Sequence, residues 1–176
     1  MFDPAPAPLV GVRRQDLPRS ASGRAPMMPP EPGTAGLAAS IDRHLAMGRR
    51  LRQPMAVLAV AVHGCRRLDG RPAPDLLHML ALEAGQRLRA RVRGTDTVLW
   101  DSGPEFAVVM NDCHPDMAMG VRKRLLASLG EPYRLGPERA VATVAIGCAC
   151  HPAAGDSGEQ MLAAALAARG LLDRDG

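Results

Sequence analysis

An uninterrupted apolar run from Met55 to Val62 constrains the fold of this chain more than any other feature. The run is rich in valine and is bounded by Pro54 and Gly64. A strand whose side chains are apolar on both sides is typical of one that is covered on both faces. We therefore expect a strand in the interior of the fold, with packed layers on either side of it.

Apolar spacing around this run predicts four helices and three further strands. The helices are one that carries Leu37, Ile41 and Leu45, two at about 75–92 and 115–129, and an alanine-rich one opened by the capping box Ser157-x-x-Gln160. The strands lie at 97–100, 106–110 and 141–150. Most connections are too short for parallel crossovers, so we expect a compact α/β sandwich with a mixed, largely antiparallel sheet and about four flanking helices.

The beginning of the chain differs in composition from the rest. Half of the sixteen prolines precede residue 37, together with several glycines. Such a stretch buries too little apolar surface to offset the entropy lost on ordering. We expect residues 1–36 to be extended or mobile, residues 37–170 to form one domain and residues 171–176 to be a C-terminal tail, because 176 residues suit a single domain.

Composition argues against several classes of protein. The net charge of +4 comes almost wholly from arginine, since Lys123 is the only lysine, and the chain has one tryptophan, one tyrosine and two phenylalanines. With so few rings to stack on bases, we expect no nucleic-acid partner. The sequence has no signal peptide and no apolar run of membrane-spanning length, which favours a cytoplasmic protein without a membrane partner.

The four cysteines, at positions 65, 113, 148 and 150, lack Cys-x-x-Cys spacing. Cys148, Cys150 and His151 are candidate metal ligands by residue type. However, Cys-x-Cys on a strand places both thiols on one face without the two-residue loop of a zinc knuckle. We therefore favour buried apolar thiols and expect no metal site.

The segment Trp100-Asp101-Ser102-Gly103-Pro104-Glu105-Phe106-Ala107-Val108-Val109-Met110 has the pattern of two short strands joined by a turn. With its neighbours it resembles the GGDEF domain of diguanylate cyclases, enzymes that join two GTP molecules into cyclic di-GMP. The resemblance extends from about Leu37 to Ala168 and includes Pro132-Tyr133 and Val144-Ala-Ile-Gly-Cys-Ala. It implies a nucleotidyl-cyclase-like sandwich and a role in bacterial second-messenger signalling.

The departures from the family's pattern fall on the residues that catalysis needs. The family places an aspartate at the end of the first strand and an acid in the hairpin turn, because its two Mg²⁺ ions require oxygen ligands. The corresponding positions here are Ala61, His63, Ser102, Gly103, Pro104 and Glu105. Glu105 alone retains a carboxylate, and the family's phosphate-binding lysine has no counterpart after Ala168. The resemblance therefore implies a degenerate domain without cyclase activity, cofactor or metal.

A second site of the family is retained. Diguanylate cyclases carry an Arg-x-x-Asp motif upstream of the hairpin that binds cyclic di-GMP, and Arg93-Gly94-Thr95-Asp96 stands at the matching distance. The same register places Arg124 where the family has a further arginine. An arginine donates to guanine O6 and N7, and an aspartate accepts from the guanine N1–H and N2–H. The resemblance thus implies a cyclic di-GMP site formed by Arg93, Asp96 and Arg124.

Three hypotheses follow from these residues. The first is a cyclic di-GMP receptor whose ligand state a protein partner detects. The second is a ligand-independent protein-interaction module, in which the degenerate fold is a docking face and the proline-rich arm of residues 1–36 binds the partner. The third is a residual cyclase. Apart from these, Arg93 and Asp96 can also be interpreted as a structural remnant that forms only a solvated ion pair.

A homodimer is one further expectation. Because the family's enzymes catalyse between two facing subunits, a heterodimer with an active cyclase is also conceivable, but no residue here supports it, and the sequence does not identify the protein partner.

Overall fold

The structure is a computed structural model, and it describes residues 33–100 and 104–172. Most of the segment that we expected to be extended or mobile lies outside the described residues. Its last four residues, 33–36, instead form the first turn of a helix. Of the expected C-terminal tail, residues 171 and 172 belong to the last helix and the others lie outside the described part.

The predicted helices and strands occur in the predicted order along the chain. Their bounds are α1 Gly33–Leu51, β1 Met55–Arg67, the short 3-10 helix η1 Pro74–Leu76, α2 Leu77–Arg91, β2 Thr97–Trp100, β3 Glu105–Asn111, α3 Pro115–Gly130, β4 Tyr133–Leu135, β5 Glu138–His151 and α4 Gly158–Leu172. The sheet has the strand order β2-β3-β1-β5-β4, and its recorded pairings are antiparallel. The α/β sandwich is confirmed, whereas β4 was not predicted.

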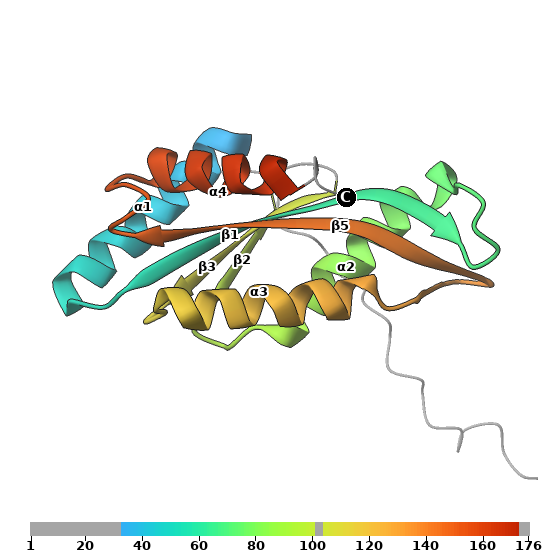
Figure 1. The fold of residues 1–176 in the computed structure, drawn as a ribbon, viewed down its shortest axis with the longest axis horizontal. Coiled ribbons are helices and arrows are strands. Elements are labelled where there is room, and N and C mark those ends of the chain that lie inside the picture. Colours follow the sequence, from blue (N-terminus) through green and yellow to red (C-terminus); the bar gives the residue numbers. More distant parts are fainter. Residues whose placement is uncertain (1–32, 101–103, 173–176) are drawn as a thin grey trace, which may run out of the picture.

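Strand β1 occupies the middle of the sheet, as its apolar run predicts. It pairs with β3 on one side and β5 on the other. Its alternate side chains enter two separate cores, with Leu58 and Val60 packed among residues of α2 and α3, and Val57 and Ala59 among residues of α1 and α4. Figure 1 shows the corresponding layers, with α1 and α4 on one face of the sheet and α2 and α3 on the other.

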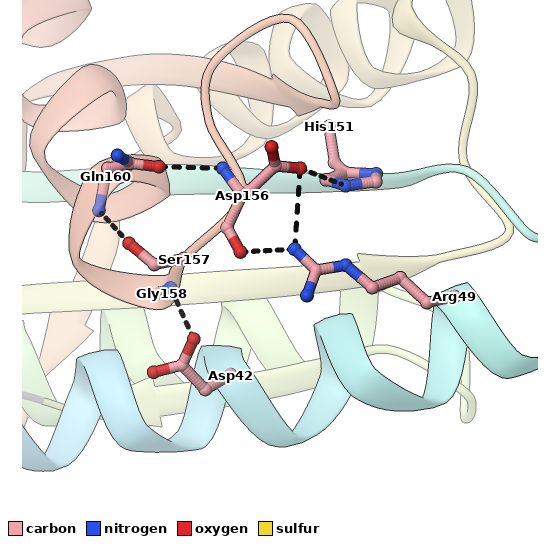
Figure 2. A network of polar contacts seen from close by, with 7 residues as sticks. All are labelled: Asp42, Arg49, His151, Asp156, Ser157, Gly158 and Gln160. Carbon is pink, nitrogen blue, oxygen red and sulfur yellow. Dashed lines mark hydrogen bonds and ion pairs between the residues drawn. The ribbon is translucent and has the colours of Figure 1, made fainter.

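A network of polar contacts fixes the start of α4 (Figure 2). Ser157 Oγ accepts from the Gln160 N–H at 3.2 Å, which is the predicted capping-box bond, and Gln160 Oε1 accepts from the Asp156 N–H at 2.8 Å. Asp42 of α1 accepts from the Gly158 N–H at 2.7 Å. These contacts satisfy N–H groups at the start of the helix and tie α4 to α1.

The described helices include none that combines the length and the hydropathy needed to cross a bilayer.

Candidate functional site

The Arg-x-x-Asp motif forms a closed turn between α2 and β2. The Arg93 N–H donates to Asp96 Oδ2 at 3.0 Å, and the Asp96 N–H donates to the Arg93 carbonyl at 3.0 Å. The carboxylate therefore bonds to the backbone of Arg93. Within the described part of the chain, the exposed Arg93 guanidinium has no recorded hydrogen bond or ion pair. The solvated Arg93–Asp96 ion pair that we considered is absent among these contacts.

Arg124 extends from α3 to the same end of α2. Its Nη2 donates to the carbonyl of Arg91 at 3.2 Å, two residues before Arg93. Carbonyl groups at a helix C-terminus carry partial negative charge, so a guanidinium is favourable there. The structure therefore places Arg124 next to the turn that carries Arg93 and Asp96.

Asn111, the last residue of β3, anchors this turn and was not among the residues chosen from the sequence. Its Nδ2 donates to the Thr95 carbonyl at 2.9 Å. Its Oδ1 lies 3.2 Å from Nδ1 of His44 in α1 and accepts a hydrogen bond from it. A lone asparagine at a strand end carries no spacing signal, so only the three-dimensional structure brings it to the turn.

Of the positions that the resemblance assigns to the cyclase active site, the described ones lie around the end of the pairing between β1 and β3. Ala61 is 3% exposed and directly faces Glu105 across the two strands. His63 is exposed, and the Pro104 carbonyl accepts from the Val62 N–H at 3.0 Å. Ser102 and Gly103, also named from the sequence, lie outside the described residues.

The guanidinium of Arg169 lies next to Glu105, the carboxylate that remains at these positions. Arg169 Nη2 of α4 contacts Glu105 Oε1 at 3.1 Å, and the side chain of Arg169 is only 17% exposed. From the sequence we expected no counterpart of the family's phosphate-binding lysine after Ala168, but Arg169 directly follows Ala168 and its guanidinium reaches this site. Its contact with Glu105 was not predicted because the two residues are far apart in the sequence.

Two adjoining hollows of about 350 and 300 Å³ open beside these positions, and they share Pro74 and Leu77. His63 and Thr143 line the larger hollow, and His78 and Pro104 line the smaller one. Among the described residues, no carboxylate lines either hollow.

Asp75, in the first turn of η1, forms an ion pair with a neighbouring arginine. Arg67 Nη2 contacts its Oδ2 at 2.9 Å, and this hydrogen bond raises the pKa of Arg67. Arg67 also contacts Glu138 at 3.4 Å. The Asp75 carboxylate is therefore paired with the Arg67 guanidinium, and it does not line either hollow.

The cysteine pair and His151 do not converge. Cys148 Sγ lies 3.9 Å from Cys150 Sγ, whereas Nε2 of His151 lies 3.2 Å from Asp156 Oδ1 (Figure 2). Burial raises the pKa of the Cys148 thiol to about 12, which keeps it protonated at neutral pH, whereas metals bind the thiolate. Over the described ranges, no group of three or more His, Cys, Asp or Glu side chains is arranged to hold a metal ion.

Comparison with known proteins connects this geometry to a family. The family model described as "Diguanylate cyclase, GGDEF domain" matches residues 78–169, just over half of the chain. The chain belongs to the GGDEF domain family. Its domain is thus of the kind that bacteria use in cyclic di-GMP signalling. The family prediction made from the hairpin is confirmed.

Relatives and solved structures agree with this assignment. The chain is 26% identical over 107 residues to the bifunctional diguanylate cyclase/cyclic di-GMP phosphodiesterase MucR of Pseudomonas aeruginosa, and the match covers 61% of the chain but only 16% of MucR. The GGDEF domain of YfiN (TpbB) from the same organism superposes with a TM-score of 0.68 at 22% identity, over 84% of this chain and 92% of that one.

A third similar structure is a GGDEF domain in complex with c-di-GMP. The GGDEF domain of DgcB from Caulobacter crescentus, solved in complex with c-di-GMP, has a TM-score of 0.62 at 15% identity, over 82% of this chain and 86% of that one. At this identity the likeness establishes the fold, and the sandwich predicted from the sequence is the GGDEF fold.

Proposed function

We propose that this GGDEF domain is a catalytically inactive receptor for cyclic di-GMP, bound by Arg93, Asp96 and Arg124. The observation that carries the proposal is the exposed guanidinium of Arg93, which has no recorded partner among the described residues, on a turn that also has Arg124 beside it. A GGDEF domain of the same fold, that of DgcB, is solved with c-di-GMP, which supports the choice of ligand.

The turn suits the recognition of a guanine base. The Arg93 guanidinium offers two parallel donors for O6 and N7. Asp96 binds the backbone through Oδ2, which leaves Oδ1 to accept from the guanine N1–H or N2–H. Arg124 supplies a second cation for a phosphate or for the face of a base. None of these contacts needs a metal ion.

The residues at the cyclase positions do not fit a pair of Mg²⁺ ions. Magnesium prefers carboxylate, carbonyl and water oxygens, and Ala61 offers no side-chain ligand while the His63 imidazole is a poor one. Glu105 is the remaining acid, and the Arg169 guanidinium at 3.1 Å competes with a cation for its oxygen. These features support the loss of cyclase activity.

Titration calorimetry of the full chain with cyclic di-GMP tests the receptor proposal. We expect binding in the micromolar range or tighter, and a loss of about tenfold or more in Arg93→Ala, because a hydrogen bond to a charged group contributes about 1.5–3 kcal/mol. Arg89→Ala is the matched control, since Arg89 is an exposed arginine in the last turn of α2. A folded wild-type chain that gives no heat with cyclic di-GMP refutes the proposal.

A ligand-independent interaction module is the second candidate, and one observation favours it. A groove of about 640 Å³ between α1 and α4 is lined mainly by Ala35, Ala38, Ala39, Leu162, Ala163 and Leu166. Small apolar side chains of this kind suit close approach of a partner helix. If this is the function, Arg93→Ala will capture the same partner as the wild type, whereas a charged residue at Leu166 will abolish capture.

A further inference from the structure

Asn111 connects two parts of the molecule through a single side-chain amide. One end of the amide donates to the Thr95 carbonyl at 2.9 Å, inside the Arg93–Asp96 turn. The other end accepts from His44 Nδ1 of α1 at 3.2 Å. Thr95 and His44 are far apart in the sequence, and within the described contacts this amide is what bonds the turn to α1.

The position of the amide is fixed by the backbone around it. Asn111 is paired with Met55 at the start of β1, and the Cys113 N–H donates to the Pro54 carbonyl at 3.1 Å. Asp112, between them, has a φ of 47°, a conformation that most residues avoid. The backbone at Asn111 is thus held by the sheet, so the amide responds to its two partners by turning about its side-chain bonds.

We propose that Asn111 is a positioning residue that orders the ligand turn and transmits its occupancy to α1 through His44. The proposal rests on the receptor function proposed above. A planar amide has its donor and acceptor fixed relative to one another, so a shift of the Thr95 carbonyl on ligand binding reorients Oδ1 as well. His44 then gains or loses its acceptor according to the state of the turn.

The path continues from His44 toward α4. Arg49, little more than one helical turn further along α1, contacts both the carbonyl and the carboxylate of Asp156 at the start of α4 (Figure 2). A change in α1 therefore reaches the contacts that hold the first turn of α4. These two helices form one face of the sandwich, which is the surface that a partner would contact to detect the ligand (Figure 1).

Hydrogen–deuterium exchange and calorimetry on the full chain test this relay, which runs from the Arg93–Asp96 turn through Asn111 and His44 to α1. His44→Leu removes the donor and puts an apolar side chain of similar size in its place, whereas His44→Gln retains a donor. Asn111→Asp keeps an acceptor for His44 but loses the donor to Thr95. We expect cyclic di-GMP to slow exchange at residues 44–51 in the wild type and in His44→Gln, but not in His44→Leu, whose affinity stays within about threefold of wild type.

Asn111→Asp removes the hydrogen bond to the Thr95 carbonyl but retains the one from His44. We expect it to weaken cyclic di-GMP binding about fivefold, because the turn loses its anchor. Equal slowing of residues 44–51 in His44→Leu and wild type, or wild-type affinity in Asn111→Asp, overturns the relay. If the wild type does not bind cyclic di-GMP, the proposed receptor function is wrong. The connection through Asn111 is then tested without ligand, by comparing hydrogen exchange in Asn111→Asp with that in the wild type. Unchanged exchange of both the Asp96 amide and residues 44–51 overturns the connection.

Discussion

Gly147 is the residue on which the packing of α4 against β5 depends most directly. A Cβ atom added there would lie 1.9 Å from the Ala165 carbonyl oxygen and 2.4 Å from the Arg169 nitrogen. Both are backbone atoms of α4, so they cannot turn aside as a side chain would. The helix itself has to move away from the sheet, and Arg169 would move with it.

We therefore predict that Gly147→Ala lowers the free energy of unfolding by about 3 kcal/mol, at the upper end of what overpacking usually costs. Urea unfolding of the full chain measures this. Gly120→Ala is the control, because nothing lies within 4 Å of a Cβ at this exposed position of α3. There we expect a gain of about 0.5–1 kcal/mol, since alanine favours a helix over glycine. Equal stabilities for the two variants would contradict the packing.

Tyr133 provides a pH-dependent prediction. Its ring is buried beneath the Arg87 guanidinium, 3.6 Å from the ring centroid, and its hydroxyl donates to the Leu129 carbonyl at 2.9 Å. Burial raises the pKa of Tyr133 to about 12, above the unfolded value of 10.0. Because the neutral phenol is favoured in the folded state, this contribution to stability is complete below pH 10 and is lost as the pH rises from 10 to 12.

The chain contains a single tyrosine and tryptophan does not ionise in this range, so the change in absorbance at 295 nm with pH follows the ionisation of Tyr133. We expect a midpoint near pH 12 in the folded protein and near pH 10 in denaturant. Circular dichroism at each pH keeps track of the folded fraction. A folded-state midpoint at the unfolded value would mean that the ring is open to solvent.

Among the elements, those with a strong local pattern were predicted and those defined by distant partners were not. The apolar run of β1 is fully buried only if the strand lies in the middle of a sheet that is covered on both faces. The capping box specifies the start of a helix through two residues that are three apart, Ser157 and Gln160. Strand β4 has only three residues, Tyr133–Leu135, and exists because it pairs with β5. Three residues are too few to establish a periodicity.

The candidate site divides in the same way. The Arg93–Asp96 motif lies within four consecutive residues, and the sequence reveals it by spacing. Asn111 and Arg169 act on residues that are distant in the sequence, and nothing local distinguishes them from other polar side chains. Their roles follow from the sheet, which brings Asn111 to Thr95, and from the close packing of α4, which brings Arg169 to Glu105.

The start of α4 yields a prediction for an element. Ser157→Ala removes the acceptor of the Gln160 N–H, and we expect the free energy of unfolding to fall by about 1 kcal/mol. Ser157→Asp retains an acceptor and complements the helix dipole, so it should remain within about 0.5 kcal/mol of wild type. Chemical unfolding compares the two. An alanine variant as stable as the aspartate variant would show that Asp42 alone suffices to cap this helix.

For the molecule as a whole, ligand binding and folding are linked. A ligand that binds only the folded chain adds about 2.7 kcal/mol to its stability at a concentration of 100 times Kd. For a chain of this size that corresponds to a rise in Tm of about 5–10 °C. We expect cyclic di-GMP to produce this rise in wild type and Arg89→Ala but not in Arg93→Ala, as measured by calorimetric melting. An equal rise in Arg93→Ala would place the ligand elsewhere.

The proposed loss of cyclase activity is also a property of the whole chain, and the Arg-x-x-Asp turn complicates its measurement. The resemblance to diguanylate cyclases implies that this turn would bind the product and inhibit an active enzyme, so an active but inhibited chain and an inactive chain can give the same low signal. Arg93→Ala separates them, because it would release inhibition. With GTP and Mg²⁺ we expect no pyrophosphate above the enzyme-free rate from either protein, since Ala61 and Pro104 supply no side-chain oxygen and Arg169 engages Glu105. Pyrophosphate released by the variant alone would reveal a product-inhibited cyclase, and the metal ligands would then have to include residues outside the described part of the chain.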